Sequence, residues 1–251
     1  MTPTLCLTFD NMGRAREIAE GLAAAPDDQE PSLAIGYPRL LALLDELGLR
    51  GTFFIEGWNG IHHPHRVEEL ARRGHEVGLH GWVHERFALL ERLRAEQLLH
   101  DGTAALARIG LRPKGFRAPG GERGEHTIPL LRALGFRYDS STDAHDSSTQ
   151  PALLAPGLAH IPWRAEMVDS IQYLRHPVRP RTPAELEALW KSLIDAEKGT
   201  ITIVIHAFVS GVDEERFTVV RRVLTHARER GMEIVTAGAL AERVLSQGRS
   251  S

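Results

Sequence analysis

Two histidines four positions apart, His80 and His84, are the side chains of this sequence best suited to chemistry. They follow a strand-like run, Glu76–Leu79, and a carboxylate and a carboxamide, Asp10 and Asn11, stand at the end of an earlier run. Two imidazole nitrogens, one oxygen ligand and a further carboxylate that activates water are the components of a catalytic site for a divalent metal ion. Asn11 stands where a third, anionic ligand would be expected. Its identity therefore bears directly on whether such a site holds metal.

Three more polar side chains, Arg117, Asp139 and His206, stand at or near the ends of other strand-like runs. The carboxyl ends of the strands in a parallel barrel face one mouth, and the active sites of such barrels are built there. We therefore expect these three residues to share a site with Asp10 and His80.

Apolar strand-like runs alternate with helical patterns through most of the chain. The expected strands are residues 5–10, 52–55, 77–80, 115–117, 138–140, 159–163, 200–206 and 233–235. The expected helices are residues 39–49, 67–73, 95–109, 127–134, 183–197 and 214–230, with a terminal helix after the last strand. This β–α order predicts a mostly parallel sheet with right-handed crossovers. Seven or eight such strands predict an α/β fold, an irregular (β/α) barrel that resembles a TIM barrel, whole or incomplete. Two long loops, residues 11–35 and 141–157, follow strand ends and are placed to wall the mouth.

The composition is that of a globular chain of 251 residues, which we expect to form a single domain, 1–251. The net charge of −3 gives no basic footprint, which argues against a nucleic-acid partner. No run approaches the roughly 20 apolar residues of a membrane span, and the N-terminus has no signal-like segment. With Cys6 as the one cysteine, these features predict a cytoplasmic protein without a membrane partner. Assembly into a homo-oligomer stays open.

Five short motifs occur in order: residues 8–11, 80–85, 116–120, 138–141 and 204–206. Together they resemble the polysaccharide deacetylase family, which has the NodB-homology fold and is also called carbohydrate esterase family 4. The His-Gly-Trp-Val-His-Glu form at 80–85 is similar to the branch that holds metal-independent allantoinases and peptidoglycan-deacetylase homologues. The resemblance covers about residues 4–240. It implies a hydrolase of non-peptide C–N bonds, and most simply the deacetylation of a small N-acyl sugar or metabolite.

The resemblance also implies roles for the strand-end residues. Asp10 would be the general base that takes a proton from water, Arg117 would orient it, and His206 would protonate the leaving nitrogen. The last role needs a carboxylate that raises the pKa of His206. Three aspartates are candidates for that partner: Asp139, Asp143 and Asp146. We group Asp139 with the catalytic residues.

A divalent metal ion, with zinc favoured, would be bound by His80, His84 and Asn11. An asparagine offers an oxygen ligand without charge, which weakens a divalent site. Three outcomes stay open: weaker metal binding, a metal-free reaction, or a site without activity. Residues expected to contact a substrate are Trp82, Trp163, Ser140 and Pro119. Aromatic faces suit sugar rings or flat heterocycles.

Two other functions fit the same residues. One is a ring-opening amidase that acts on a cyclic ureide or imide, as the similarity to allantoinases implies. The other is a catalytically silent barrel that binds a sugar or has a regulatory role.

Overall fold

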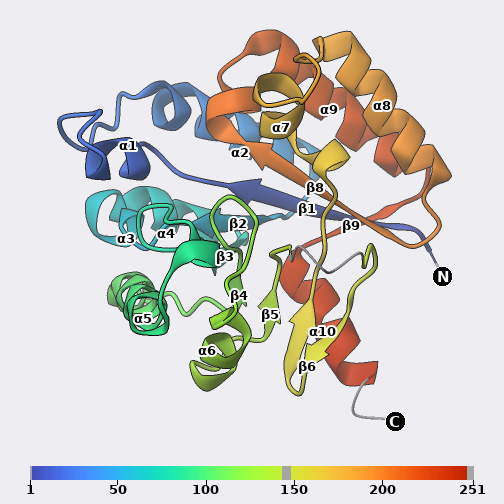
Figure 1. Ribbon diagram of the computed structural model, residues 1–251. Coiled ribbons are helices and arrows are strands. Elements are labelled where there is room, and N and C mark those ends of the chain that lie inside the picture. The colour runs from blue at the N-terminus through green and yellow to red at the C-terminus, as the bar shows by residue number, and fades with distance from the viewer. Residues whose placement is uncertain (1, 143–147, 248–251) are drawn as a thin grey trace.

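Nine strands form one curled sheet in the computed structural model, which describes residues 2–142 and 148–247 (Figure 1). The strands are β1 (Thr4–Asp10), β2 (Thr52–Ile55), β3 (Glu76–Leu79), β4 (Gly115–Phe116), β5 (Tyr138–Asp139), β6 (Ala152–Ala155), β7 (Leu158–His160), β8 (Thr200–His206) and β9 (Glu233–Val235). Their order is β6-β7-β5-β4-β3-β2-β1-β8, with β9 beside β1. Only the β6–β7 pair is antiparallel among these described strands. The predicted barrel is confirmed in its incomplete form, since β6 and β8 end the order of described strands without pairing with each other.

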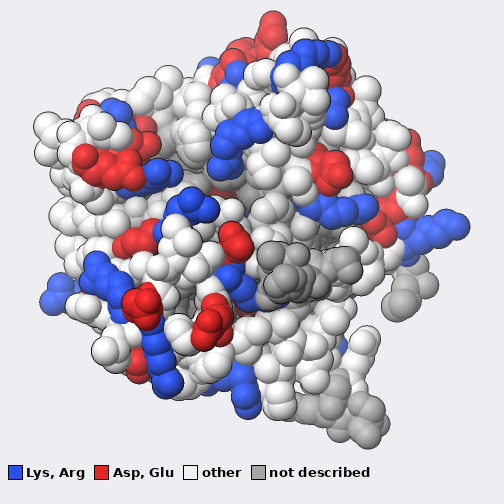
Figure 2. Space-filling view, in the orientation of Figure 1, with Lys and Arg blue, Asp and Glu red and all other residues white. Residues whose placement is uncertain are grey.

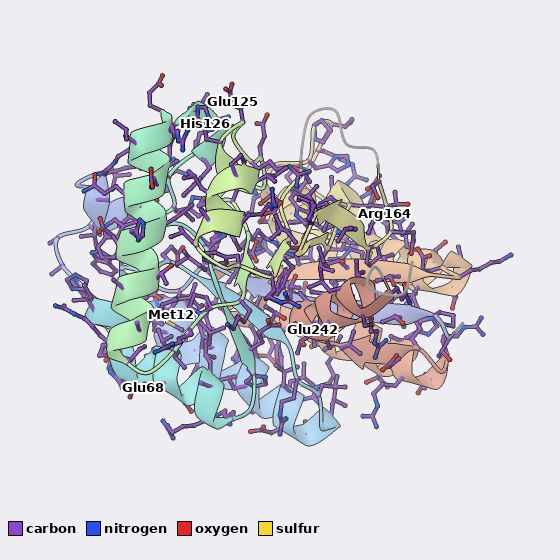
Figure 3. All side chains as sticks on the ribbon, turned by 90° about the horizontal axis from the view of Figure 1, so that it is seen from below. Met12, Glu68, Glu125, His126, Arg164 and Glu242 are labelled. Atoms are coloured by element: carbon purple, nitrogen blue, oxygen red, sulfur yellow. The ribbon has the colours of Figure 1, made fainter. Side chains whose placement is uncertain are left out.

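Most of the helices lie on the outer side of the sheet (Figure 1). The α-helices are α1 (Ala15–Ala19), α2 (Tyr37–Leu47), α3 (Asn59–His62), α4 (Pro64–Arg72), α5 (Arg92–Arg108), α6 (Thr127–Ala133), α7 (Asp169–Leu174), α8 (Pro183–Ala196), α9 (Glu214–Glu229) and α10 (Ala237–Gln247). The last helix, which carries Glu242, packs under the sheet against Cys6, Phe54 and Tyr138, and Figure 3 shows the molecule from that side. None of the helices in the described part of the chain combines the length and the hydropathy that a membrane span requires.

The two-residue period of β1 decides which of its side chains reach the site. Leu5, Leu7 and Phe9 point outward and join the large apolar core beneath the helices. Asp10 has the opposite phase and points to the inner side. Because β1 and β8 pair in register, Asp10 lies directly opposite His206 on the neighbouring strand.

The expected alternation of strands and helices is confirmed, and the two long loops contain further elements. The segment 11–35 contains α1 and the first four residues of a π-helical turn, η1 (Ser32–Gly36). The segment 141–157 contains β6, which forms a hairpin with β7 through Gly157, where φ is +80°. The strand expected at 159–163 ends at His160, two residues before Pro162, which has no backbone N–H for the sheet.

Candidate active site

A cavity of about 460 Å³ opens at the carboxyl ends of the strands. Its lining includes the titratable residues Asp10, Glu56, His80, His84 and His206. The first of the two long loops forms part of its wall through Arg14, Arg16, Glu17, Glu30 and Pro31. Basic and acidic side chains are interspersed over the face of the molecule shown in Figure 2.

Asp10 is buried and forms an ion pair with Arg117, with 2.7 Å between Oδ1 and Nη1. Two further hydrogen bonds hold the guanidinium in place. Nη2 donates to Ser140 Oγ at 2.7 Å, and Nε donates to the Ser140 carbonyl oxygen at 3.1 Å. The guanidinium also lies 4.3 Å from the centre of the Phe54 ring. Burial acts to raise the pKa of Asp10, but the charge of Arg117, with smaller contributions from the nearby histidines, outweighs it and lowers this pKa. Asp10 is therefore ionised at neutral pH, as a general base must be.

His206 is paired with Asp169, the first residue of α7, and its Nδ1 lies 2.6 Å from Asp169 Oδ1. The other carboxylate oxygen accepts hydrogen bonds from the His206 backbone N–H at 2.9 Å and from the Ser210 hydroxyl at 2.6 Å. Because a carboxylate only accepts, Nδ1 carries a proton and Nε2 is left for the cavity. Burial acts to lower the pKa of His206, but the charge and hydrogen bond of Asp169 offset this, and the pKa is raised.

The expectation that Asp139, Asp143 or Asp146 supports His206 is therefore corrected in favour of Asp169. Asp143 and Asp146 lie outside the described residues. Asp139 has no exposed surface and is bound elsewhere, because its Oδ2 lies 2.6 Å from Arg123 Nη1. Asp139 does not line the cavity, and its place among the catalytic residues stays a prediction. Its carboxylate fixes the loop beside it, where it accepts from Ser141 Oγ at 2.6 Å.

His80 and His84 lie side by side, with 5.1 Å between their ring centres. Burial lowers the pKa of His80 to about 4 and that of His84 to about 3, so both rings are neutral at neutral pH. The Nδ1 atom of His80 donates to the carbonyl oxygen of Arg117 at 2.8 Å, which leaves Nε2 with its lone pair. The Nδ1 atom of His84 is buried and has no hydrogen-bond partner among the described residues. Neutral rings with free nitrogen atoms are the form of histidine that binds a metal ion.

Asn11 adopts a left-handed backbone conformation, with φ of +66°, and its amide Nδ2 donates to Glu56 Oε1 at 2.6 Å. Glu56 is buried, and its Oε2 accepts from the Met12 backbone N–H at 3.1 Å and from Asn59 Nδ2 at 3.0 Å. Burial raises the pKa of Glu56 to about 7, against the lowering effect of its hydrogen bonds. Among residues 2–142 and 148–247, no group of three histidine, cysteine, aspartate or glutamate side chains is arranged to hold a metal ion. A third ligand beside the two histidines would therefore be the neutral oxygen of Asn11.

The Polysaccharide deacetylase family profile matches residues 2–138, more than half of the chain. The chain belongs to the polysaccharide deacetylase family. It is 36% identical over 116 residues to a peptidoglycan deacetylase-like protein from Gibberella zeae, covering 45% of this chain and 34% of that protein. It is 28% identical over 170 residues to a peptidoglycan deacetylase from Helicobacter pylori, covering 66% of this chain and 58% of that protein. The chain thus spans between about a third and three fifths of the length of these relatives.

The likeness of fold extends over almost the whole chain. A solved structure from Mycobacterium smegmatis, assigned to the polysaccharide deacetylases, superposes with a TM-score of 0.85 at 29% identity. The match covers 98% of this chain and 91% of that one. The deacetylase fold therefore includes the C-terminal part that carries His206.

The residues expected to contact a substrate have different places in this deacetylase fold. Trp163 lines the cavity, and its Nε1 donates to the Ser140 carbonyl oxygen at 2.9 Å. Trp82 is half-buried and packs against the apolar core, while Ser140 is buried and its hydroxyl donates to the Ile161 carbonyl oxygen at 2.7 Å. Pro119 is buried as well, and its neighbours Gly120 and Gly121 line the cavity in its place.

Two carboxylates of the candidate site, those of Glu56 and Asp169, were not predicted from the sequence. Glu56 directly follows β2, and the strand-end argument that selected Asp10 would have found it. Asp169 begins a short helix and follows no predicted strand, so no pattern in the sequence singles it out.

Proposed function

We propose that this protein hydrolyses the amide bond of an N-acetylated sugar and releases acetate and the free amine. One observation carries the proposal: a buried aspartate held in its ionised form lies across from a buried histidine whose pKa is raised. A base and an acid set apart in this way, both lining one cavity, are what amide hydrolysis by water requires. The names of the two deacetylase relatives support the same reaction.

The chain's own residues divide the reaction between them. Asp10 takes a proton from a water molecule as the water oxygen forms a bond to the carbonyl carbon. His206 then gives the proton on Nε2 to the amide nitrogen, and the C–N bond breaks to leave acetate and the amine. Arg117 keeps Asp10 ionised and oriented, and Asp169 does the same for His206 in its protonated form. A divalent ion held by His80, His84 and Asn11 would polarise the carbonyl group and lower the pKa of the water.

The size of the cavity is consistent with a small substrate, or with one sugar unit of a larger substrate. Its volume of about 460 Å³ lies within the range of small-molecule sites, roughly 300–1,000 Å³. Trp163 provides an aromatic surface against which a sugar ring can pack.

The proposal is tested by following two products from a panel of substrates. Amine and acetate are measured with N-acetylglucosamine, its short β-linked oligomers and peptidoglycan fragments, and ring opening is measured with allantoin. We expect amine and acetate in equal amounts from at least one N-acetyl sugar. Ring opening without amine release would favour the cyclic ureide amidase. Saturable sugar binding without product would favour the silent barrel.

A further inference from the structure

Glu56 is a buried carboxylate on which three N–H donors converge. They come from the Asn11 side chain, the Met12 backbone and the Asn59 side chain, at 2.6, 3.1 and 3.0 Å. Each of the three donors needs an acceptor, and the two Glu56 oxygens accept all three hydrogen bonds, with the NH₂ ends of both amide side chains turned to Glu56.

This requirement fixes the direction of the Asn11 amide. Its Nδ2 is committed to Glu56, while Oδ1 has no hydrogen-bond partner in the described part of the chain. Asn11 lines the same cavity as His80 and His84. The left-handed backbone at Asn11, with φ of +66°, further limits how the side chain leaves the strand end.

We propose that Glu56 is a positioning residue that holds the Asn11 amide with Oδ1 toward His80 and His84 and so makes that oxygen the third ligand of a divalent ion. The inference rests on the deacetylase site proposed above, but it concerns ion binding and is read separately from catalysis. A partner that orients a ligand from behind in this way typically changes metal affinity 10- to 100-fold when it is removed.

The same geometry changes what is expected of Asn11→Asp. That substitution places a second carboxylate against Glu56 Oε1, where the amide N–H now lies at 2.6 Å. Two carboxylates at such a distance repel or must share a proton. The double variant N11D/E56Q exchanges the acid and the amide between the two positions and restores a donor against an acceptor.

The experiment measures Zn²⁺ and Co²⁺ binding by calorimetry and by the cobalt absorption spectrum, without substrate. The proteins are the natural chain, E56Q, N11D and N11D/E56Q, and folding of each is checked by circular dichroism. The matched control is E76Q, which removes a carboxylate at the end of β3 that is remote from His80. There Glu76 accepts hydrogen bonds from the Tyr138 and Thr52 hydroxyl groups.

We expect one ion per natural chain, an affinity lower by about tenfold or more in E56Q, and little change in E76Q. N11D/E56Q should bind at least as tightly as the natural chain, and N11D should melt at a lower temperature than the double variant when metal is absent. Equal affinity of E56Q and the natural protein would overturn the proposal. So would a natural chain that binds no ion at millimolar concentrations, or a double variant that binds no better than E56Q. Should E56Q fail to fold, the comparison of N11D/E56Q with the natural chain still decides. Failure of the proposed deacetylase function would be seen in a different measurement, because the natural protein would then release no acetate.

Discussion

Asp10 and His206 lie opposite each other on neighbouring strands, and their partners move their pKa values in opposite directions. Arg117 lowers the pKa of Asp10, and Asp169 raises that of His206. The two groups are thus kept in the charged forms that a base and an acid need before the reaction starts. The pKa of Asp10 depends on Arg117 and the pKa of His206 depends on Asp169, so a variant of each partner tests one pair at a time.

The first residue-scale prediction concerns Asp169→Asn. The natural His206 stays protonated through pH 6.5 and loses its proton as pH rises through its raised pKa, so activity should decline on that side. Without the charge of Asp169, burial lowers the pKa, and the high-pH limb of kcat should move to lower pH. Each unit of that fall reduces the protonated fraction above the pKa about tenfold. A pH profile of Asp169→Asn that overlies the natural one would contradict the role given to this pair.

The second residue-scale prediction concerns Arg117→Met, which leaves Asp10 buried without its cation. Breaking a buried pair in this way costs about 3–5 kcal/mol in the free energy of unfolding. In the natural protein the folded-state pKa of Asp10 lies below its ordinary 3.8, so its contribution is complete above that value and is lost as pH falls through the folded pKa. Urea unfolding at pH 7 measures the loss. The double variant D10N/R117M should recover part of it, and no recovery would argue against the ion pair as the cause.

At the scale of elements, two very short strands position the Arg117 guanidinium. The strands β4 and β5 each have two residues, and they approach so closely that a Cβ on Gly115 would lie 1.9 Å from Tyr138 Cζ. Glycine at 115 is therefore required by the neighbouring ring and not by a turn. The strand that carries Arg117 depends on this contact for its place.

Gly115→Ala should consequently destabilise the protein by about 3 kcal/mol, the upper part of the range for overpacked sites. Gly110→Ala is the matched control, since a Cβ there meets no atom within 4 Å and only the backbone, with φ of +77°, resists the change. We expect a loss of about 1 kcal/mol for the control. Thermal unfolding compares the stability of the two variants. Equal losses of stability would show that the Tyr138 ring can move aside at little cost.

Sequence patterns predicted the elements whose side chains follow a simple period. The strand 200–206 and the strand 52–55 have the bounds expected of them, because β-branched and aromatic residues run without interruption there. The strand β6 was not predicted, because its sequence Ala-Leu-Leu-Ala favours a helix and only pairing with β7 makes it extended. The helix α7 is six residues long, too short for a helical period to appear.

At the scale of the whole molecule, the site is assembled from segments far apart in the chain. The strand-end rule brought Asp10, His80 and His206 together from the sequence alone, since parallel strands end at one edge. It could not supply Asp169, which reaches His206 by a side-chain contact across 37 positions. Such contacts depend on how the connecting segment folds back over the sheet.

The most direct measurement is the acetate released from an N-acetylated chitooligosaccharide in ¹⁸O-labelled water, compared between the natural protein and Asp10→Asn. The natural protein should release acetate that carries one solvent oxygen, because water attacks the carbonyl carbon. Asp10→Asn, with its folding checked by circular dichroism, should lose at least about a hundredfold in kcat, the usual effect of removing a general base. Acetate release by Asp10→Asn at the natural rate would contradict hydrolysis driven by this carboxylate.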